Sequence, residues 1–216
     1  MNRLRAASFA LTLAASSLLA SLAQAQFPTT QPTRQPVFGK NPVSNDDSSA
    51  LVQNPANLGF MPAAELRWSS LYLNEQAKVP WQGHALALAF PIPFINAATG
   101  VRVDLINPPE GVEGSQFEGG GLYQWVTWGL AFRPSESFGF GFSLQNSYSE
   151  QESAHGLFSW SLGLTTRPSD YFGLAFVASD INAPSNEAGG KIDRSFDIGL
   201  AVRPLRSRSL ELSVDG

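Results

Sequence analysis

The chain has 216 residues, no cysteine, 15% charged residues and a formal net charge of −4. The absence of cysteine excludes a disulfide framework and a cysteine-ligated zinc site. The net negative charge and the lack of any cluster of Lys and Arg exclude the basic surface that nucleic-acid binding requires. The length suits one ordinary domain or a modest barrel.

Residues 1–25 have the three parts of a secretory signal peptide. Met1-Asn2-Arg3-Leu4-Arg5 is basic, residues 6–20 are apolar with small polar interruptions, and Ala23-Gln24-Ala25 is a small-x-small cleavage pattern. We expect export with cleavage after Ala25, because the apolar stretch is too short for the alternative, a membrane anchor. No later window holds about 18 consecutive apolar residues, so we expect no membrane-spanning helix.

Two short segments follow. Residues 26–45 are rich in Pro, Thr and Gln, which predicts a linker that is flexible or polyproline-like. Residues 46–62 are expected to begin with a short helix, capped by a residue of 46–48 and ended at Asn54 by Pro55. The motif Asn54-Pro55-Ala56-Asn57 then predicts a turn.

From residue 63 onward, large apolar residues alternate with small or polar ones. The alternating runs are residues 66–72, 85–90, 101–105, 122–132, 138–144, 158–164, 174–176, 196–202 and 210–214. Alternation of this kind predicts about nine strands with two unlike faces. The connections alternate between short turns and long polar loops, which is typical of an up-and-down antiparallel sheet.

An Arg-Pro phrase recurs at one end of this pattern. It occurs as Arg133-Pro134, Arg167-Pro168 and Arg203-Pro204. We interpret each copy as a short periplasmic turn, in which Pro fixes φ at the turn entry. The three arginines have the parity of the small-residue face. They form either a lumenal ring that favours anionic solutes or, as we favour, membrane-edge charges that pair with Glu136, Asp170 or a lipid headgroup.

The composition of the two faces favours a membrane over water. One face is rich in Phe, Trp and Leu, whereas the other holds Gly, Ser, Ala and Thr with few charges. A strand of about 11 residues, rising roughly 3.3 Å each and tilted about 40°, spans about 28 Å, which suits an outer membrane. The sequence therefore predicts an all-β, up-and-down antiparallel transmembrane β-barrel in residues 63–216. A soluble exported β-sandwich is a weaker alternative.

A count of nine strands is unusual for such a barrel, because it is odd. In hydrocarbon an open sheet edge is untenable, and bacterial single-chain barrels have even strand numbers. The last apparent strand stops at Val214-Asp215-Gly216 without a terminal aromatic residue. We expect the chain to be the front part of a longer barrel; an even count with an atypical end is the alternative.

Catalytic motifs are absent from the sequence. His84 and His155 lack metal-ligand spacing, no serine lies in G-x-S-x-G, and Glu118-Gly119-Gly120-Gly121 lacks the Lys of a phosphate-binding loop. We therefore expect no catalytic residue, metal or cofactor here. The tryptophans Trp68, Trp125, Trp128 and Trp160 are expected at the membrane interface or facing lipid.

Two stretches resemble known families. Residues 48–58, with Asn54-Pro55-Ala56, resemble the start of FadL-like and PorV-like outer-membrane proteins, which implies a plug inside the barrel. Residues 158–168 and 196–204 resemble hairpins in the barrel-like N-terminal region of some myxobacterial signal peptide peptidase A proteins. The Ser-Lys pair of that family has no counterpart here, so the resemblance implies no catalytic residue in this chain.

These observations support two hypotheses of function. The first is an outer-membrane barrel that acts as a channel, a hydrophobic-solute transporter or a scaffold, with residues 46–62 as its plug. Its expected partners are outer-membrane lipid, a hydrophobic or small solute and the barrel-assembly machinery. The second is the membrane-associated front region of a signal peptide peptidase A-type serine peptidase.

Overall fold

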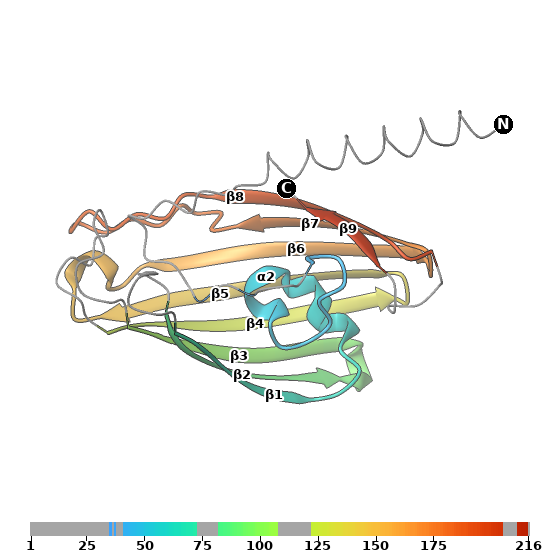
Figure 1. Ribbon diagram of the computed structural model, residues 1–216, viewed down its shortest axis with the longest axis horizontal. Coiled ribbons are helices and arrows are strands. Elements are labelled where there is room, and N and C mark those ends of the chain that lie inside the picture. Colours follow the sequence, from blue (N-terminus) through green and yellow to red (C-terminus); the bar gives the residue numbers. More distant parts are fainter. Residues whose placement is uncertain are drawn as a thin grey trace, which may run out of the picture.

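A computed structural model describes residues 35, 37, 41–72, 82–107, 122–204 and 211–215. Their main feature is one nine-stranded antiparallel sheet in which each strand pairs with its neighbour in sequence. The strands are β1 (Glu65–Leu71), β2 (Gly83–Ile92), β3 (Ala97–Ile106), β4 (Tyr123–Ser135), β5 (Phe138–Ser149), β6 (Phe158–Ser169), β7 (Phe172–Ser179), β8 (Ser195–Val202) and β9 (Leu212–Asp215). Figure 1 shows this meander running from β1 at one edge to β9 near the other.

The prediction of about nine strands in an antiparallel up-and-down order is confirmed. The sheet is not closed into a barrel, because no pairing joins β1 to β9 among the described residues. In the same part of the chain, no helix has both the length and the apolarity needed to cross a membrane.

The connections at the two ends of the sheet differ in length. At one end, which we call the turn end, β2 and β3 are joined by η2 (Pro93–Ile95), β4 and β5 by two residues, and β6 and β7 by two residues. At the other end, the loop end, longer segments join β5 to β6, through η3 (Glu152–Ala154), and β7 to β8. The expected alternation of short and long connections is thus present in these segments.

The first two Arg-Pro pairs lie in the last residues of a strand, just before the turn, whereas Arg203 and Pro204 directly follow β8. Pro134 belongs to β4 and Pro168 to β6, and the strand register shifts at both places. The reason is that proline has no N–H to donate to the ladder and is confined in sheets to edges, ends and bulges.

The backbone N–H groups of the three arginines repeat one further contact. Each donates to a carbonyl of the preceding turn, as in Arg133 to Asn96 (2.7 Å), Arg167 to Ser137 (2.6 Å) and Arg203 to Tyr171 (2.7 Å). This bond is the structural counterpart of the sequence repeat, since it connects the arginine at each strand end to the short turn before it.

The two faces of the sheet have opposite environments. On the outer face, large apolar side chains are exposed, including Trp68 on β1 and Ile198 on β8, at 73% and 61%. The other members of this apolar surface include Leu86, Leu88, Phe90, Val101, Trp128, Phe140, Leu162, Leu164, Leu174 and Phe176. On the inner face, small and polar residues such as Ala87, Thr127 and Ser143 are buried.

The inner face is covered by residues 41–62, which we call the inner segment. It contains α2 (Ala50–Gln53) and η1 (Pro55–Phe60) and lies over the middle of the sheet (Figure 1). The predicted turn at Asn54–Asn57 is instead the start of a 3-10 helix, because Pro55 is well suited to a first helical position. Part of the expected linker is also packed, because Gln35, Val43 and Asn45 are buried.

Glycines on the inner face allow the backbone of the inner segment to come close. A Cβ atom added at Gly141 would lie 2.6 Å from the carbonyl of Pro55, and one at Gly163 would lie 2.1 Å from Asn54 Oδ1. A side chain at Gly141 would meet backbone, and one at Gly163 would require the buried Asn54 side chain to move, so the sheet and the inner segment are matched in shape.

A second buried cluster lies on the inner face toward the loop end. It consists of Ile106, Tyr123, Trp125, Ala154, Leu157 and Ile192. Trp125 is fully buried there, so the expectation that it faces lipid is wrong. The alternation of β4 explains this position, because Trp125 has the opposite parity to the exposed Trp128.

Candidate functional site

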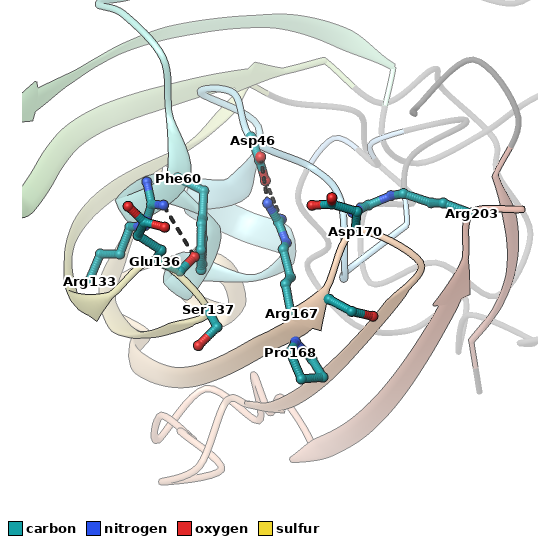
Figure 2. A pocket seen from close by; sticks show the side chains of 10 residues that line it. Asp46, Phe60, Arg133, Glu136, Ser137, Arg167, Pro168, Asp170 and Arg203 are labelled. Carbon is teal, nitrogen blue, oxygen red and sulfur yellow. Dashed lines mark hydrogen bonds and ion pairs between the residues drawn. The ribbon is translucent and has the colours of Figure 1, made fainter. Parts of the chain in front are cut away.

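A pocket of about 450 Å³ opens at the turn end, between the inner segment and the strand ends (Figure 2). It is lined by Asp46, Phe60, Arg133, Glu136, Ser137, Arg167, Pro168, Ser169, Asp170 and Arg203. The structure therefore brings together the arginines of all three Arg-Pro repeats. They reach one pocket because β4, β6 and β8, alternate strands of the meander, run in the same direction and end at the same end of the sheet.

Arg167 is the most extensively bonded of the three. Its Nη1 donates to Asp46 Oδ2 at 2.7 Å, and its Nη2 donates to the other carboxylate oxygen of Asp46 and to the carbonyl of Val43 at 2.6 Å. The side chains of Arg167 and Asp46 are 10% and 1% exposed. This is a bidentate ion pair with its charges almost removed from water, the geometry that makes arginine–carboxylate contacts strong.

Phe60 of the inner segment lies between two arginines (Figure 2). The guanidinium carbon of Arg167 is 4.2 Å from the centre of the Phe60 ring, and that of Arg133 is 4.8 Å from it. A cation is attracted to the face of an aromatic ring within about 6 Å. The ring therefore holds two like charges near each other at the floor of the pocket.

Arg203 is also buried and pairs with a different acid. Its Nε donates to Glu211 Oε2 at 2.7 Å, and the other oxygen of Glu211 accepts from Ser44 of the inner segment. The Nη2 atom of Arg203 is buried and has no hydrogen-bond partner. Arg203 thus ties the start of β9 to the inner segment while keeping one donor unused.

Arg133 differs from the other two arginines. Its Nη2 donates to the backbone carbonyl of Glu136 at 3.1 Å, and it forms no ion pair with any carboxylate of the described chain. The side chains of Glu136 and Asp170 also line the pocket, but both residues are exposed. The arginines, of which Arg167 and Arg203 are buried and Arg133 is half-buried, thus form the floor of the pocket with Asp46, and the two solvated acids form its rim.

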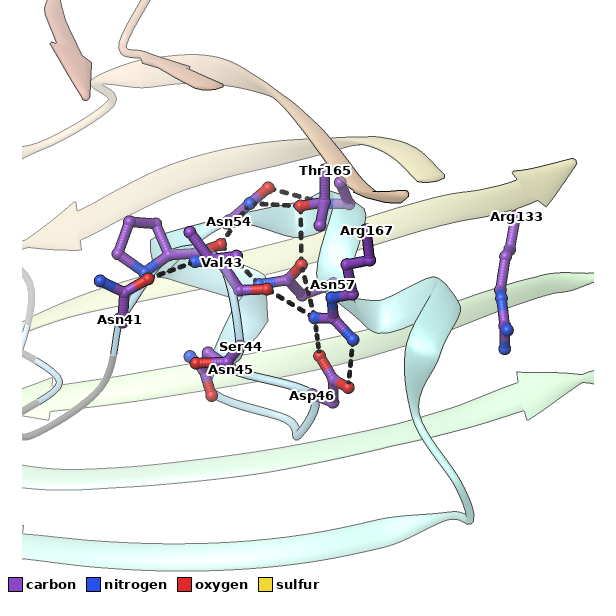
Figure 3. Close-up of polar contacts among 12 residues, drawn as sticks. Asn41, Val43, Ser44, Asn45, Asp46, Asn54, Asn57, Arg133, Thr165 and Arg167 are labelled. Carbon is purple, nitrogen blue, oxygen red and sulfur yellow. Dashed lines mark hydrogen bonds and ion pairs between the residues drawn. The ribbon is translucent and has the colours of Figure 1, made fainter. Parts of the chain in front are cut away.

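The Asn-Pro-Ala-Asn motif holds the inner segment to itself and to β6 (Figure 3). The Nδ2 atoms of Asn54 and Asn57 both donate to the carbonyl of Pro42, at 2.6 and 2.7 Å. Asn54 also donates to Thr165 Oγ1 at 2.9 Å, and Thr165 donates to Asn57 Oδ1 at 2.7 Å. These buried polar groups satisfy one another, which is the condition for a stabilising buried network.

A second set of contacts joins the inner segment to β1. Arg67 Nη2 lies 2.7 Å from Asp47 Oδ2 and 2.8 Å from Glu65 Oε1, and Glu65 accepts a hydrogen bond from the backbone N–H of Ser48 at 2.7 Å. Neighbouring aspartates, Asp46 and Asp47, therefore contact strands that are far apart in the sheet.

The residues singled out from the sequence have distinct positions. Asn54, Pro55 and Ala56 lie buried against the inner face, whereas Pro134, Pro168 and Pro204 are exposed at the turn end. The arginines of the repeats do not pair with the carboxylates of Glu136 or Asp170; their partners Asp46 and Glu211 lie elsewhere in the chain. Sequence reasoning missed Asn57, Thr165 and Phe60 as parts of the site, although Asn57 stands in the same short motif as Asn54.

The two histidines lie away from this pocket. His84 contacts Ser70 Oγ and Tyr72 on the outer side of β1 and β2, and the backbone N–H of Ser149 donates to His155 Nδ1 at the loop end. Within the described ranges, no group of three or more potential ligands is arranged to hold a metal ion.

The candidate site is thus a polar pocket with an arginine floor, sealed on one side by an inner segment that is bonded to β1, β6 and the start of β9. Comparison of the chain with family models, curated proteins and solved structures finds no match.

Proposed function

We propose that this protein is part of the wall of an outer-membrane β-barrel, and that its inner segment is a plug that keeps the interior closed. The observation that carries the proposal is the inverted distribution of side chains across the sheet. Phe140, Leu162 and Ile198 are 39%, 43% and 61% exposed on the outer face, while Thr127 and Ser143 are fully buried inside.

The size of the apolar surface supports a lipid environment. Monomeric soluble proteins seldom expose contiguous apolar patches larger than a few hundred Å². Here exposed Leu, Phe, Ile, Val or Trp side chains occur on the outer face of every strand from β1 to β9. Strands β4, β5 and β6, with 13, 12 and 12 residues, are also much longer than the usual five or six.

Lipid would impose a further requirement on the sheet edges. Unpaired N–H and C=O groups of β1 and β9 cost several kcal/mol each in hydrocarbon, so both edges must find strand partners there. We propose that further strands supply them and complete the barrel.

The inner segment supports a closed resting state. It contacts β1 through Asp47 and lies against Gly199 of β8 through Pro42 and Val43. In a flat sheet with strands spaced about 4.8 Å apart, β1 and β8 would be about 34 Å apart, so residues 42–47 reach both strands because the sheet curves around them. We propose that small solutes pass when this segment moves.

A second candidate is a membrane scaffold whose interior stays filled. The tight fit of Pro55 against Gly141 and of Asn54 against Gly163 favours it, because displacing such a segment would open cavities. This role agrees with the anchoring function implied by the resemblance to the N-terminal region of signal peptide peptidase A.

Two measurements test the proposal. Outer-membrane fractionation with heat-modifiable migration in unboiled gels should show a membrane-embedded barrel; recovery as a soluble periplasmic protein would refute it. Single-channel conductance before and after deletion of residues 41–62 then separates the candidates. A rise in conductance supports a gated passage, and unchanged conductance supports the scaffold.

A further inference from the structure

We propose that the turn-end pocket is a binding site for an oxyanion, a phosphate or a carboxylate, held by Arg133 with the help of Arg203. This site does not depend on whether the outer face contacts lipid. It goes beyond the proposed function, a barrel wall closed by the inner segment, because it assigns a ligand to the protein.

The first argument is the charge balance at the floor of the pocket. Arg167 is paired with Asp46, and Arg203 is paired with Glu211. Arg133 has only a backbone carbonyl as its hydrogen-bond acceptor and forms no ion pair with a described carboxylate. Arg133 is therefore the one arginine of the pocket whose guanidinium has no carboxylate partner among the described residues, and Figure 3 shows it standing apart from the network around Arg167.

The second argument is the presence of unused buried donors. Arg203 is 7% exposed, lines the pocket, and its Nη2 atom has no partner. Arg167 Nε is likewise buried without an acceptor. Native proteins rarely leave buried charged donors unsatisfied, because the desolvation of such a group is costly. An oxyanion in the pocket supplies the missing acceptors.

The third argument is the shape of the cation. Arginine offers planar, paired donors that match the oxygens of phosphate and carboxylate. Stacking of Arg133 on Phe60 orients its guanidinium. Two donors of Arg133 can then reach one oxyanion while the pocket, at about 450 Å³, holds the rest of the molecule.

The acids of the pocket limit the class of ligand. Glu136 and Asp170 are exposed at the rim, so their repulsion of an anion at the floor is screened by water and salt. The same screening leaves only a weak attraction of these acids for a cationic group on the same molecule. A zwitterion with a phosphate and an ammonium group therefore fits both parts, whether it is free or the headgroup of a phospholipid.

The test is titration calorimetry of the full chain in detergent micelles, at constant ionic strength, with two probes: inorganic phosphate and glycerophosphoethanolamine. We expect saturable one-to-one binding of at least one probe. Tighter binding of glycerophosphoethanolamine identifies a headgroup site, and tighter binding of phosphate identifies a free-anion site. Absence of saturable binding by both probes overturns the proposal.

Matched variants locate the site. Arg133→Gln should weaken binding at least tenfold, whereas Arg194→Gln, the same loss of charge in an exposed loop-end residue, should change affinity less than twofold. Glu136→Gln should strengthen binding of phosphate and weaken that of glycerophosphoethanolamine. If Arg133→Gln does not fold, Arg133→Lys keeps the charge without the paired donors and should still weaken binding several-fold. Equal effects of the residue 133 and residue 194 variants would show diffuse charge attraction and refute the site.

Discussion

Asp46 in the inner segment and Arg167 at the end of β6 form a buried bidentate ion pair between residues 121 positions apart in sequence. Breaking a buried pair by removing one partner leaves a charge without compensation, which typically costs 3–5 kcal/mol. Loss of either partner alone should therefore be costly, because the other charge would remain buried without compensation.

Asp46→Asn should loosen the inner segment by about 3 kcal/mol, because Arg167 keeps its charge in a site that is closed to water. The measurement is the rate of proteolysis within residues 41–62 of the protein in micelles. Asp193→Asn is the control, since the Lys191–Asp193 pair is 60% exposed on both sides and such pairs contribute about 0–1 kcal/mol. Equal rates of proteolysis of the two variants would contradict the prediction that the Asp46–Arg167 ion pair holds the inner segment on the sheet.

Asn54→Asp should also destabilise the docked inner segment, by about 2 kcal/mol or more. The substitution keeps the shape but turns the donor that faces the carbonyl of Pro42 into a buried carboxylate oxygen. Denaturant midpoints measure the effect. Asn182→Asp is the control because that amide, bonded to Phe158, is exposed, and its replacement should change stability by less than about 0.5 kcal/mol.

Gly163→Ala should displace the inner segment, because the new Cβ would lie 2.1 Å from Asn54 Oδ1. We expect a loss of about 1–3 kcal/mol, as for other overpacked interiors. The informative control is the same substitution in a chain that lacks residues 41–62. There the cost should vanish, and a cost that persists would mean that Gly163 is required by the strand itself.

Leu162→Arg tests the environment of the outer face. In the middle of a membrane-spanning strand, arginine costs about 2–4 kcal/mol, whereas near the interface it costs about 0–1 kcal/mol. Insertion into lipid vesicles should therefore fall for Leu162→Arg and change little for Val202→Arg at the end of β8. If water covers this face, both variants should be equally stable.

The strands could be predicted well because their signal is local. Over residues 138–144 of β5 and 158–164 of β6 every second residue is large and apolar, and period two follows from strand geometry alone. The same rule puts Trp125 and Trp128 on opposite faces of β4, so the burial of Trp125 could have been predicted from the sequence. The prediction was wrong because it relied on the usual position of tryptophan in membrane proteins and not on the face of the strand that residue 125 occupies.

The candidate site could not be predicted to the same depth. The contacts of Asp46 with Arg167 and of Asn57 with Thr165 join residues more than 100 positions apart. Such pairs depend on how the inner segment lies on the sheet, and no periodicity encodes that placement. The Arg-Pro spacing did predict that the arginines share one end of the sheet, although it did not identify their acidic partners.

The bonds between the inner segment and distant strands bear on how the sheet obtains its curvature. Asp47 reaches Arg67 on β1, Asp46 reaches Arg167 on β6, and Ser44 reaches Glu211 beside β9. Because these three contacts come from residues 44–47, they hold widely separated strands near one short stretch of chain, and we expect them to favour a curved sheet. The inner segment precedes β1 in the chain, so it can be present before the last strands are added.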